Sequence, residues 1–309
     1  MNTQSNAMPE SLDSQRIAPA ILSPTRPFYW SLRRELWENR SIYVAPLAVA
    51  AVYLFGFMIS MIHLPDKMRT LAALDPSHQH ELFTRPYEFA EGMLMATAMI
   101  VAIFYSLDAL YGERRDRSIL FWKSLPVSDL TTVLVKASVP LFILQVLAFV
   151  ISVALQWIML LLNSAVLAGS GHSAAKLWTE ISPFQMWAGL FYHLMTVHAL
   201  WHAPIYCWML LVSAWARRAP FLWASLPLLA VGILERIIFN SSHFGTFLMY
   251  RLSGPQDFSF KVNTGDSMNM TAPNNLGRFL ITPGLWIGLI AAALFLVLAA
   301  RIRRNREPI

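Results

Sequence analysis

The sequence predicts an all-α membrane protein with six transmembrane helices, and two observations lead to that prediction. Hydrophobic residues make up 56% of the 309 residues and charged residues only 14%, whereas a soluble globular domain carries roughly 25% charged residues. In addition, six long apolar runs are separated by polar segments. Each run is close to or above the ~20 residues that a helix needs to cross the hydrocarbon core of a bilayer.

The predicted spans occupy residues 41–62, 89–111, 132–162, 186–214, 221–239 and 279–300. The third and fourth runs are long enough to tilt or to emerge from the bilayer. Four prolines lie inside the runs, namely Pro46, Pro140, Pro204 and Pro227. Because proline removes a backbone donor and clashes with the preceding turn, each predicts a kink.

Residues 25–40 precede the first span and combine aromatic, leucine and arginine side chains. Phe28, Leu32 and Leu36 recur at four-residue spacing, while Trp30 and Trp37 lie on another side. This composition favours an amphipathic helix at the membrane interface; a simple aromatic and basic anchor for the first span is the alternative. Residues 1–24 are polar and are predicted to be a disordered cytoplasmic tail, which leaves 41–309 as the six-span domain.

The distribution of lysine and arginine predicts that both termini lie in the cytoplasm. With that orientation, the cytoplasmic segments hold fifteen basic residues and the outer segments seven, in agreement with the positive-inside rule. The net charge of +6 comes from short basic runs beside apolar segments. Such runs are typical of membrane topology and do not indicate a nucleic-acid partner.

Several chemical motifs are absent from the sequence. It contains no GxxxxGK[ST], HExxH or GxSxG pattern, so the familiar signatures of a nucleotide-binding loop, a zinc protease and a serine hydrolase are missing. The single Cys207 allows no internal disulfide and no cysteine metal cluster. We therefore expect no cofactor and no metal bound by this chain.

Ionisable residues inside the spans are candidates for a substrate path, because charged and polar groups avoid lipid and face a cavity or a partner. His198 and His202 are four residues apart on the fourth span, and Glu235 lies late in the fifth. The histidines either face the bundle interior or bind a metal. Glu235 either lines the path or marks the outer water boundary. Lys136, four residues into the third span, is predicted to reach back to the cytoplasm.

The loop between the second and third spans is rich in both charge and apolar side chains. Residues 111–130 read YGERRDRSILFWKSLPVSDL. The apolar residues 119–122 point all round a helix, which indicates that one side meets the membrane bundle and another meets a protein. The alternative is a loop buried between helices.

This loop, from Gly112-Glu113-Arg114-Arg115 to Leu125-Pro126-Val127-Ser128, resembles the first cytoplasmic loop of type-2 ATP-binding-cassette (ABC) exporter permeases. It departs from that family at Asp116-Arg117-Ser118, where many members have Gly-Thr, and at the bulky Phe121-Trp122 pair. The resemblance implies a coupling helix that sits in a groove on a separate ATPase subunit. The residues implied in that contact are Glu113, Arg114, Arg115, Asp116, Arg117, Phe121, Trp122, Lys123, Leu125 and Pro126.

The resemblance also implies a function. The chain is expected to be the membrane-spanning permease subunit of an ABC exporter in the inner membrane of a bacterium, without ATPase activity of its own. ATP and Mg²⁺ would be bound by the ATPase subunits, and the permease would pair with itself or with a second permease. Two alternatives stay open: a polytopic membrane enzyme that uses His198 and His202, and a membrane sensor or scaffold whose loop docks a signalling partner.

Overall fold

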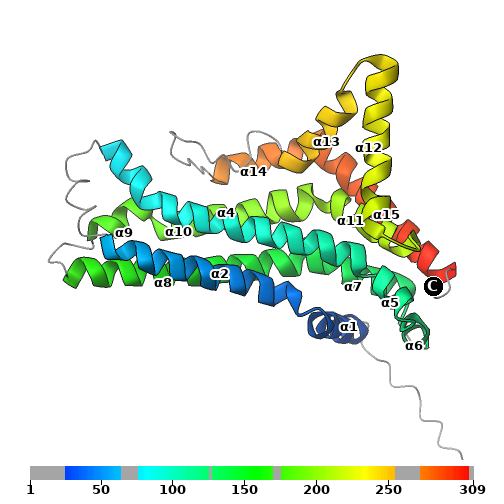
Figure 1. Cartoon of the computed structure of the whole chain (residues 1–309), viewed down its shortest axis with the longest axis horizontal. Helices are drawn as coiled ribbons and strands as arrows, with labels where there is room; N and C mark the ends of the chain where they lie inside the picture. The colour runs from blue at the N-terminus through cyan, green and yellow to red at the C-terminus, as the bar shows by residue number, and fades with distance from the viewer. Residues whose placement is uncertain (1–24, 64–75, 125–126, 170–174, 255–271, 306–309) are drawn as a thin grey trace, which may run out of the picture.

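A computed structural model describes residues 25–63, 76–124, 127–169, 175–254 and 272–305, and all its regular elements within these ranges are helical (Figure 1). The α-helices are α1 (Thr25–Glu38), α2 (Ser41–Ser60), α4 (Pro76–Asp108), α5 (Tyr111–Arg115), α6 (Ile119–Lys123), α7 (Asp129–Ser138), α8 (Leu144–Gly169), α9 (Ala175–Ile181), α10 (Pro183–His193), α11 (Ala203–Trp215), α12 (Pro220–Phe239), α13 (His243–Ser253), α14 (Ala272–Ile281) and α15 (Pro283–Asn305). A 3₁₀ turn, η1 (Met61–His63), and two π-helical segments, η2 (Val139–Ile143) and η3 (Leu194–Trp201), complete the described elements. The predicted tail 1–24 lies outside the described residues.

Five of these helices are long and apolar enough to cross a membrane, and a bent pair brings the number to six. The five are Ser41–Ser60, Phe83–Arg115, Asp129–Gly169, Pro220–Phe239 and Pro283–Asn305, and the bent pair is Leu177–Trp201 with Ala203–Trp215. The prediction of an all-helical chain with several apolar spans is therefore confirmed for the described residues.

Some predicted boundaries are wrong. The second span was expected from residue 89, yet α4 already begins at Pro76. The sixth span was expected from residue 279, yet α14 ends at Ile281 and α15 begins at Pro283. Proline is preferred in the first turn of a helix, where its missing N–H costs nothing. Both helices therefore begin at a proline, Pro76 or Pro283, and the length of an apolar run does not predict such a start.

Among the described residues, a bend of more than 40° occurs at one of the four prolines, Pro204. Pro140 lies in the π-helical segment η2, inside the third span. Pro204 begins α11 just after the break that follows η3, where the span bends by 45°. Pro46 and Pro227 lie inside continuous helices. The fourth span is thus broken at its middle, and this break shapes the polar interior described below.

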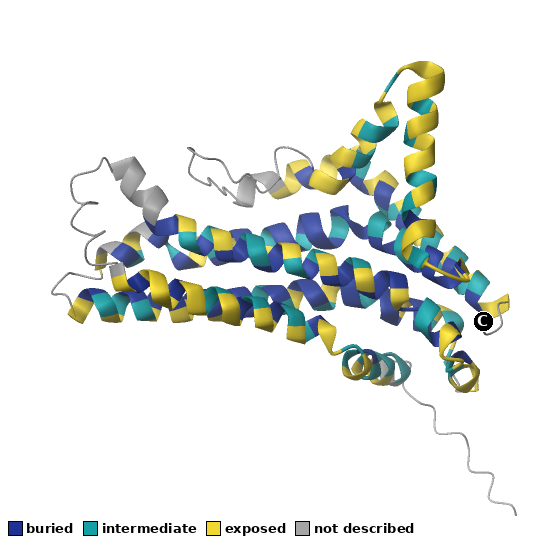
Figure 2. Ribbon diagram, viewed as in Figure 1, coloured by how far each residue is buried: buried dark blue, intermediate teal, exposed yellow. Residues whose placement is uncertain are grey.

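The core is formed by long helices that run alongside one another (Figure 1). One buried cluster joins α2, α4, α8 and α9 through residues such as Tyr87, Leu94 and Met159. A second joins α2, α4, α8 and α11 through Ile42, Leu144 and others. Figure 2 shows α12 largely exposed outside this bundle, and Ala224 is its one buried residue. The bundle therefore rests on α2, α4, α8, α11 and α15.

Four elements gather at one end of the bundle, which we call the loop end: α1, α5, α6 and the last turn of α15 (Figure 1). The helix predicted before the first span is present as α1. Leu32 and Leu36 on α1 pack against the bundle, whereas Trp30 and Trp37 are exposed. The predicted amphipathic pattern of α1 therefore separates a packed side from an aromatic outer side.

Candidate functional site

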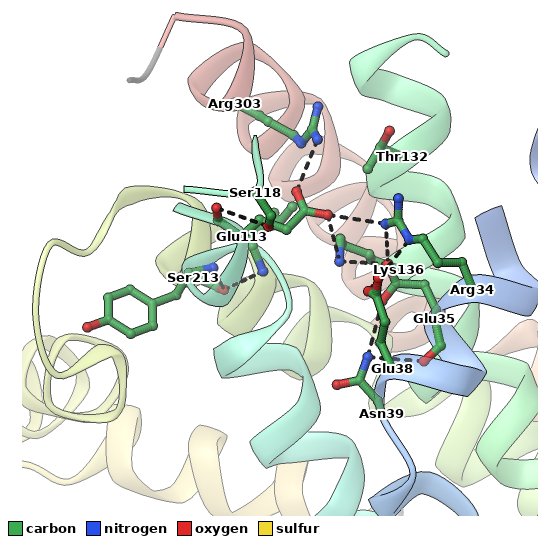
Figure 3. A network of polar contacts seen from close by, with 12 residues as sticks. Arg34, Glu35, Glu38, Asn39, Glu113, Ser118, Thr132, Lys136, Ser213 and Arg303 are labelled. Carbon is green, nitrogen blue, oxygen red and sulfur yellow. Dashed lines mark hydrogen bonds and ion pairs between the residues drawn. The ribbon is translucent and has the colours of Figure 1, made fainter. Parts of the chain in front are cut away.

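The loop end contains a largely buried network of charges, which we call the charge network: Arg34, Glu35, Glu113, Asp129, Lys136 and Arg303. Figure 3 labels these residues except Asp129. These residues come from α1, α5, α7 and α15. Three are carboxylates and three are cations, so the charges balance. Since α1 and α15 are far from α5 and α7 in sequence, the charge network connects the two ends of the chain's helical part to the loop.

Glu35 on α1 is one centre of the charge network and is 1% exposed. Its carboxylate accepts hydrogen bonds from Lys136 Nζ at 2.8 Å, from Arg34 Nη2 at 2.8 Å and from the Tyr105 hydroxyl at 2.9 Å. Burial alone would raise the pKa of Glu35, but the charges of Lys136 and Arg34 and their hydrogen bonds outweigh burial and lower it. Glu35 is therefore held as a carboxylate.

Glu113 on α5 is the second centre. Its Oε1 atom lies 3.1 Å from Lys136 Nζ and 3.3 Å from Arg34 Nη2, and its Oε2 atom lies 3.0 Å from Arg303 Nη2. Arg303 also pairs with Asp129. Lys136 thus bridges the two centres, and Glu113 fixes the start of the loop to α1, α7 and α15.

Arg114 holds the same loop to α11. Its guanidinium donates hydrogen bonds to the backbone carbonyls of Ser213, at 2.8 Å, and Ala216, at 2.5 Å. The Ser213 hydroxyl in turn accepts from the backbone N–H groups of Leu110 and Tyr111, each at 2.9 Å. These bonds satisfy carbonyls at the end of α11 that have no intrahelical partner, and they lock α5 against the fourth span.

Beyond this anchored base, α5 and α6 form an exposed tip. Ile119 faces inward and is 1% exposed, whereas Leu120 and Phe121 are 61% and 60% exposed. Trp122 is half-buried, with the Arg34 guanidinium 3.6 Å from its ring centre, a favourable cation–π contact. One side of α6 therefore meets the bundle while Leu120 and Phe121 project from it.

The ten loop residues implied by the resemblance fall into three groups. Arg115, Asp116, Arg117, Phe121 and Lys123 are exposed and Trp122 is half-buried. Glu113 and Arg114 are buried and engaged within the chain, so they are not surface residues and we leave them out of any docking surface. Leu125 and Pro126 lie outside the described residues.

The prediction for Lys136 was wrong. It was expected to extend to the water phase, but it is 3% exposed and pairs with Glu35 and Glu113. A charged side chain inside a span can be satisfied by pairing with an opposite charge instead of reaching water. Here α1 and α5 bring two carboxylates to it, one from far upstream in the sequence and one from the loop.

The histidines of the fourth span form a second polar region, which we call the histidine column: His193, His198 and His202. Ring centres are 5.5 Å apart for His193 and His198 and 5.3 Å apart for His198 and His202. The π-helical segment η3 brings positions five apart into line as well as positions four apart. All three side chains are buried, as expected if they face the bundle interior.

The helix α13, which lies between the fifth and sixth predicted spans, packs against the histidine column. Trp201 Nε1 donates to the Arg251 carbonyl at 3.2 Å, and His202 Nε2 lies 2.9 Å from the Leu252 carbonyl. Because a carbonyl only accepts, Nε2 carries the proton and Nδ1 of neutral His202 is an acceptor. The Nδ1 atoms of His198 and His202 are buried without a hydrogen-bond partner among the described residues.

Metal binding by the histidine column finds no support in the geometry, because no group of three or more His, Cys, Asp or Glu side chains among the described residues is arranged to hold a metal ion. Glu235, the third residue predicted for a substrate path, lies elsewhere. It accepts hydrogen bonds from the backbone N–H groups of His243 and Phe244, at 2.7 and 2.8 Å. These are the first residues of α13, so Glu235 caps that helix.

Sequence reasoning missed Glu35, Asp129 and Arg303 as parts of one site. The sequence did show two groups that need a partner, namely a glutamate among the leucines of residues 25–40 and Lys136 inside the third span. The sequence did not show that Glu35 pairs with Lys136, because this pairing depends on how α1 crosses the end of α7. Glu91, a buried carboxyl in the second span, was also missed.

No protein-family model, curated protein or solved structure matches the chain.

Proposed function

We propose that the chain is the membrane-spanning permease subunit of an ABC exporter, and that the exposed tip of α5 and α6 is where a separate ATPase subunit docks. The observation that carries this proposal is the construction of the loop. Its tip projects Phe121 and Leu120, and its base is tied to other helices by Glu113 and Arg114. A plain connector between spans needs neither feature.

The exposed tip has the composition of a docking surface. Leu120 and Phe121 are exposed apolar side chains, and Arg115, Asp116 and Arg117 surround them with charge. An aromatic side chain with a charged rim is a common anchor in protein interfaces, where the aromatic fills a pocket and the charges set the orientation. Arg117 has a positive φ of 57°, and this turns the chain sharply between α5 and α6.

The base of the loop provides a route for coupling. A force on α6 reaches α1 through Arg34 and Trp122, reaches α7 and α15 through Glu113, and reaches α11 through Arg114. A partner changes the arrangement of the spans only if it contacts the loop differently in its two states. The sequence contains no ATP-binding loop of its own, so in this proposal the ATPase subunit supplies those two states.

Purification of the tagged chain from its native membrane in mild detergent tests the proposal. We expect a stoichiometric partner whose sequence contains a GxxxxGK[ST] motif. Phe121→Ala should abolish its recovery, whereas Phe184→Ala, at an exposed phenylalanine on α10, should leave it unchanged. Recovery of no such partner, or equal recovery with Phe121→Ala, would refute the docking assignment.

A further inference from the structure

A second buried carboxyl system lies in the interior of the bundle, apart from the charge network. Glu91 on α4 is 1% exposed. Its Oε1 atom accepts a hydrogen bond from Gln156 Nε2 on α8 at 2.7 Å. The Gln156 amide oxygen accepts from Trp187 Nε1 on α10 at 2.8 Å. The carboxyl is therefore the end of a directed hydrogen-bond chain that crosses three helices.

The helices packed around Glu91 bring almost no charge to it. Neither α2 nor α8 contains an Asp, Glu, Lys, Arg or His. The titratable groups on the surrounding elements are Tyr43 and Tyr53 on α2; Arg85, Tyr87, Glu88, Tyr105 and Asp108 in the part of α4 from residue 83; Tyr192 and His193 on α10; His198 on η3; and Lys176 and Glu180 on α9. The side chains of Lys176 and Glu180 lie outside the described part. Across the described residues, no cation pairs with Glu91.

One helical turn away, a second uncharged pair repeats the arrangement. Asn163 Nδ2 on α8 donates to the Tyr87 hydroxyl on α4 at 2.8 Å. Around both pairs lie apolar residues of the main core, including Leu94, Leu155 and Met159. An ionised carboxylate in such surroundings has lost its hydration and gained one amide donor, which is far too little to compensate. A protonated carboxyl has no such penalty.

We propose that Glu91 is a proton-binding site. In the described arrangement it is a neutral carboxylic acid that accepts from Gln156 through its carbonyl oxygen. When α4 separates from α8 and α10 and water reaches the side chain, the O–H bond breaks and the proton passes to water, which leaves a hydrated carboxylate. Opening of this contact is therefore linked to release of one proton, and closing to its uptake. An ionisable residue inside a membrane span commonly serves in this way.

Glu35 provides a matched comparison within the same chain. Both carboxyls are 1% exposed, yet Glu35 has Lys136 and Arg34 within 2.8 Å, whereas Glu91 has one neutral amide. Burial is thus equal and only the partner differs. We expect Glu35 to be ionised and Glu91 to be protonated at the same neutral pH.

Infrared difference spectroscopy of the reconstituted full chain at neutral pH tests this directly. The carbonyl stretch of a protonated carboxylic acid is separate from the carboxylate bands. We expect one such band in the wild type that disappears in Glu91→Gln and persists in Glu35→Gln. A spectrum in which Glu91→Gln removes no carboxylic-acid band would overturn the proposal. This readout needs neither substrate nor ATPase, so it stands or falls independently of the proposed exporter function.

A second variant guards against misfolding of Glu91→Gln. Gln156→Leu removes the hydrogen bond donated to the Glu91 carbonyl and leaves the carboxyl in place, so the same band should move to higher frequency. In addition, thermal stability of the wild type should fall as the pH rises from the ordinary glutamate pKa of 4.5 towards neutral, because the unfolded chain then ionises while the folded state keeps Glu91 protonated. An unshifted band in Gln156→Leu, or a stability that is flat over that pH range, would contradict proton binding at Glu91.

Discussion

The charge network and the histidine column both place ionisable side chains in the interior of a membrane protein. The first consists of paired opposite charges, whereas the second consists of neighbouring imidazole rings. In the charge network each carboxylate faces at least one cation, and the partners come from α1, α5, α7 and α15. In the histidine column the rings are close to one another and to α13, yet the Nδ1 atoms of His198 and His202 have no hydrogen-bond partner among the described residues.

The difference follows from charge. An unpaired ion in a low-dielectric interior is strongly destabilising, so a charged cluster persists only when its geometry keeps every ion paired. A neutral imidazole that lacks one hydrogen bond costs much less. We therefore expect the charge network to be rigid and essential to the fold. We expect the histidine column, next to a π-helical break, to tolerate change with local effects.

Lys136→Met should produce the largest effect, because it removes the fully buried cation that Glu35 and Glu113 share and leaves them only the partly exposed Arg34 in common. Removing one partner of a buried ion pair typically costs about 3–5 kcal/mol, and the methionine side chain retains the packing. Thermal or denaturant unfolding of the detergent-solubilised protein measures the loss.

The control for Lys136→Met is Glu38→Gln, since Glu38 is half exposed and its ion pair with Arg34 is 3.6 Å long. Surface pairs of that kind contribute about 0–1 kcal/mol. The double variant Glu35→Gln/Lys136→Met should lose less free energy of unfolding than the two single variants lose in sum. In the double variant, neither Glu35 nor Lys136 remains as a charge that has lost its partner. Strict additivity would mean that the two residues are not coupled.

Arg114 and its neighbour Arg115 give a matched pair for the anchoring of α5. Arg114 is 2% exposed and donates to two carbonyls of α11, whereas Arg115 is exposed and pairs with Asp108 and Asp116 at the surface. Hydrogen bonds to charged groups contribute about 1.5–3 kcal/mol. Arg114→Ala should therefore lower the free energy of unfolding by roughly that amount, as followed by chemical denaturation, and Arg115→Ala should change it little. Equal effects would disprove the anchor.

Acidification should weaken the charge network through Glu35, with a smaller effect than removal of Arg114. The pKa of Glu35 lies below its ordinary value of 4.5 in the folded protein. Its contribution to stability is thus fully present above pH 4.5 and is lost as the pH falls through the lowered pKa. Melting temperatures measured from neutral to acidic pH should fall less steeply for Glu35→Gln than for the wild type. Parallel curves would indicate that Glu35 does not contribute to the acid transition.

Much of the fold was predictable, because apolar runs of about 20 residues have few alternatives to membrane helices. The first and fifth spans end within two residues of their predicted limits. The α6 turn was also predictable in kind: its apolar residues point all round, and the structure buries Ile119 while exposing Phe121. Local pattern was sufficient wherever a feature depends on neighbouring residues alone.

The candidate sites depend on long-range packing and could not be predicted to the same extent. Glu113 and Arg114 look like surface charges in the sequence, because nothing local indicates that Arg303 and Ser213 will reach them. The 45° break in the fourth span arises at the end of η3, and the residues on both sides of it are predominantly apolar. The contact between α13 and His202 could likewise not be predicted, because nothing local to residues 243–253 indicates that they return to the fourth span.

The smallest change in stability is expected for a substitution in the histidine column, and the informative result is which helix it destabilises. His202→Ala removes one hydrogen bond, from Nε2 to the Leu252 carbonyl at the end of α13, and a neutral bond contributes about 0.5–1.5 kcal/mol. Because α13 otherwise has few buried residues, we expect faster amide hydrogen exchange in 243–253 and unchanged protection in α1 and α7. Faster exchange throughout the bundle would mean that the histidine column supports the whole fold, and the contrast with the charge network would be wrong.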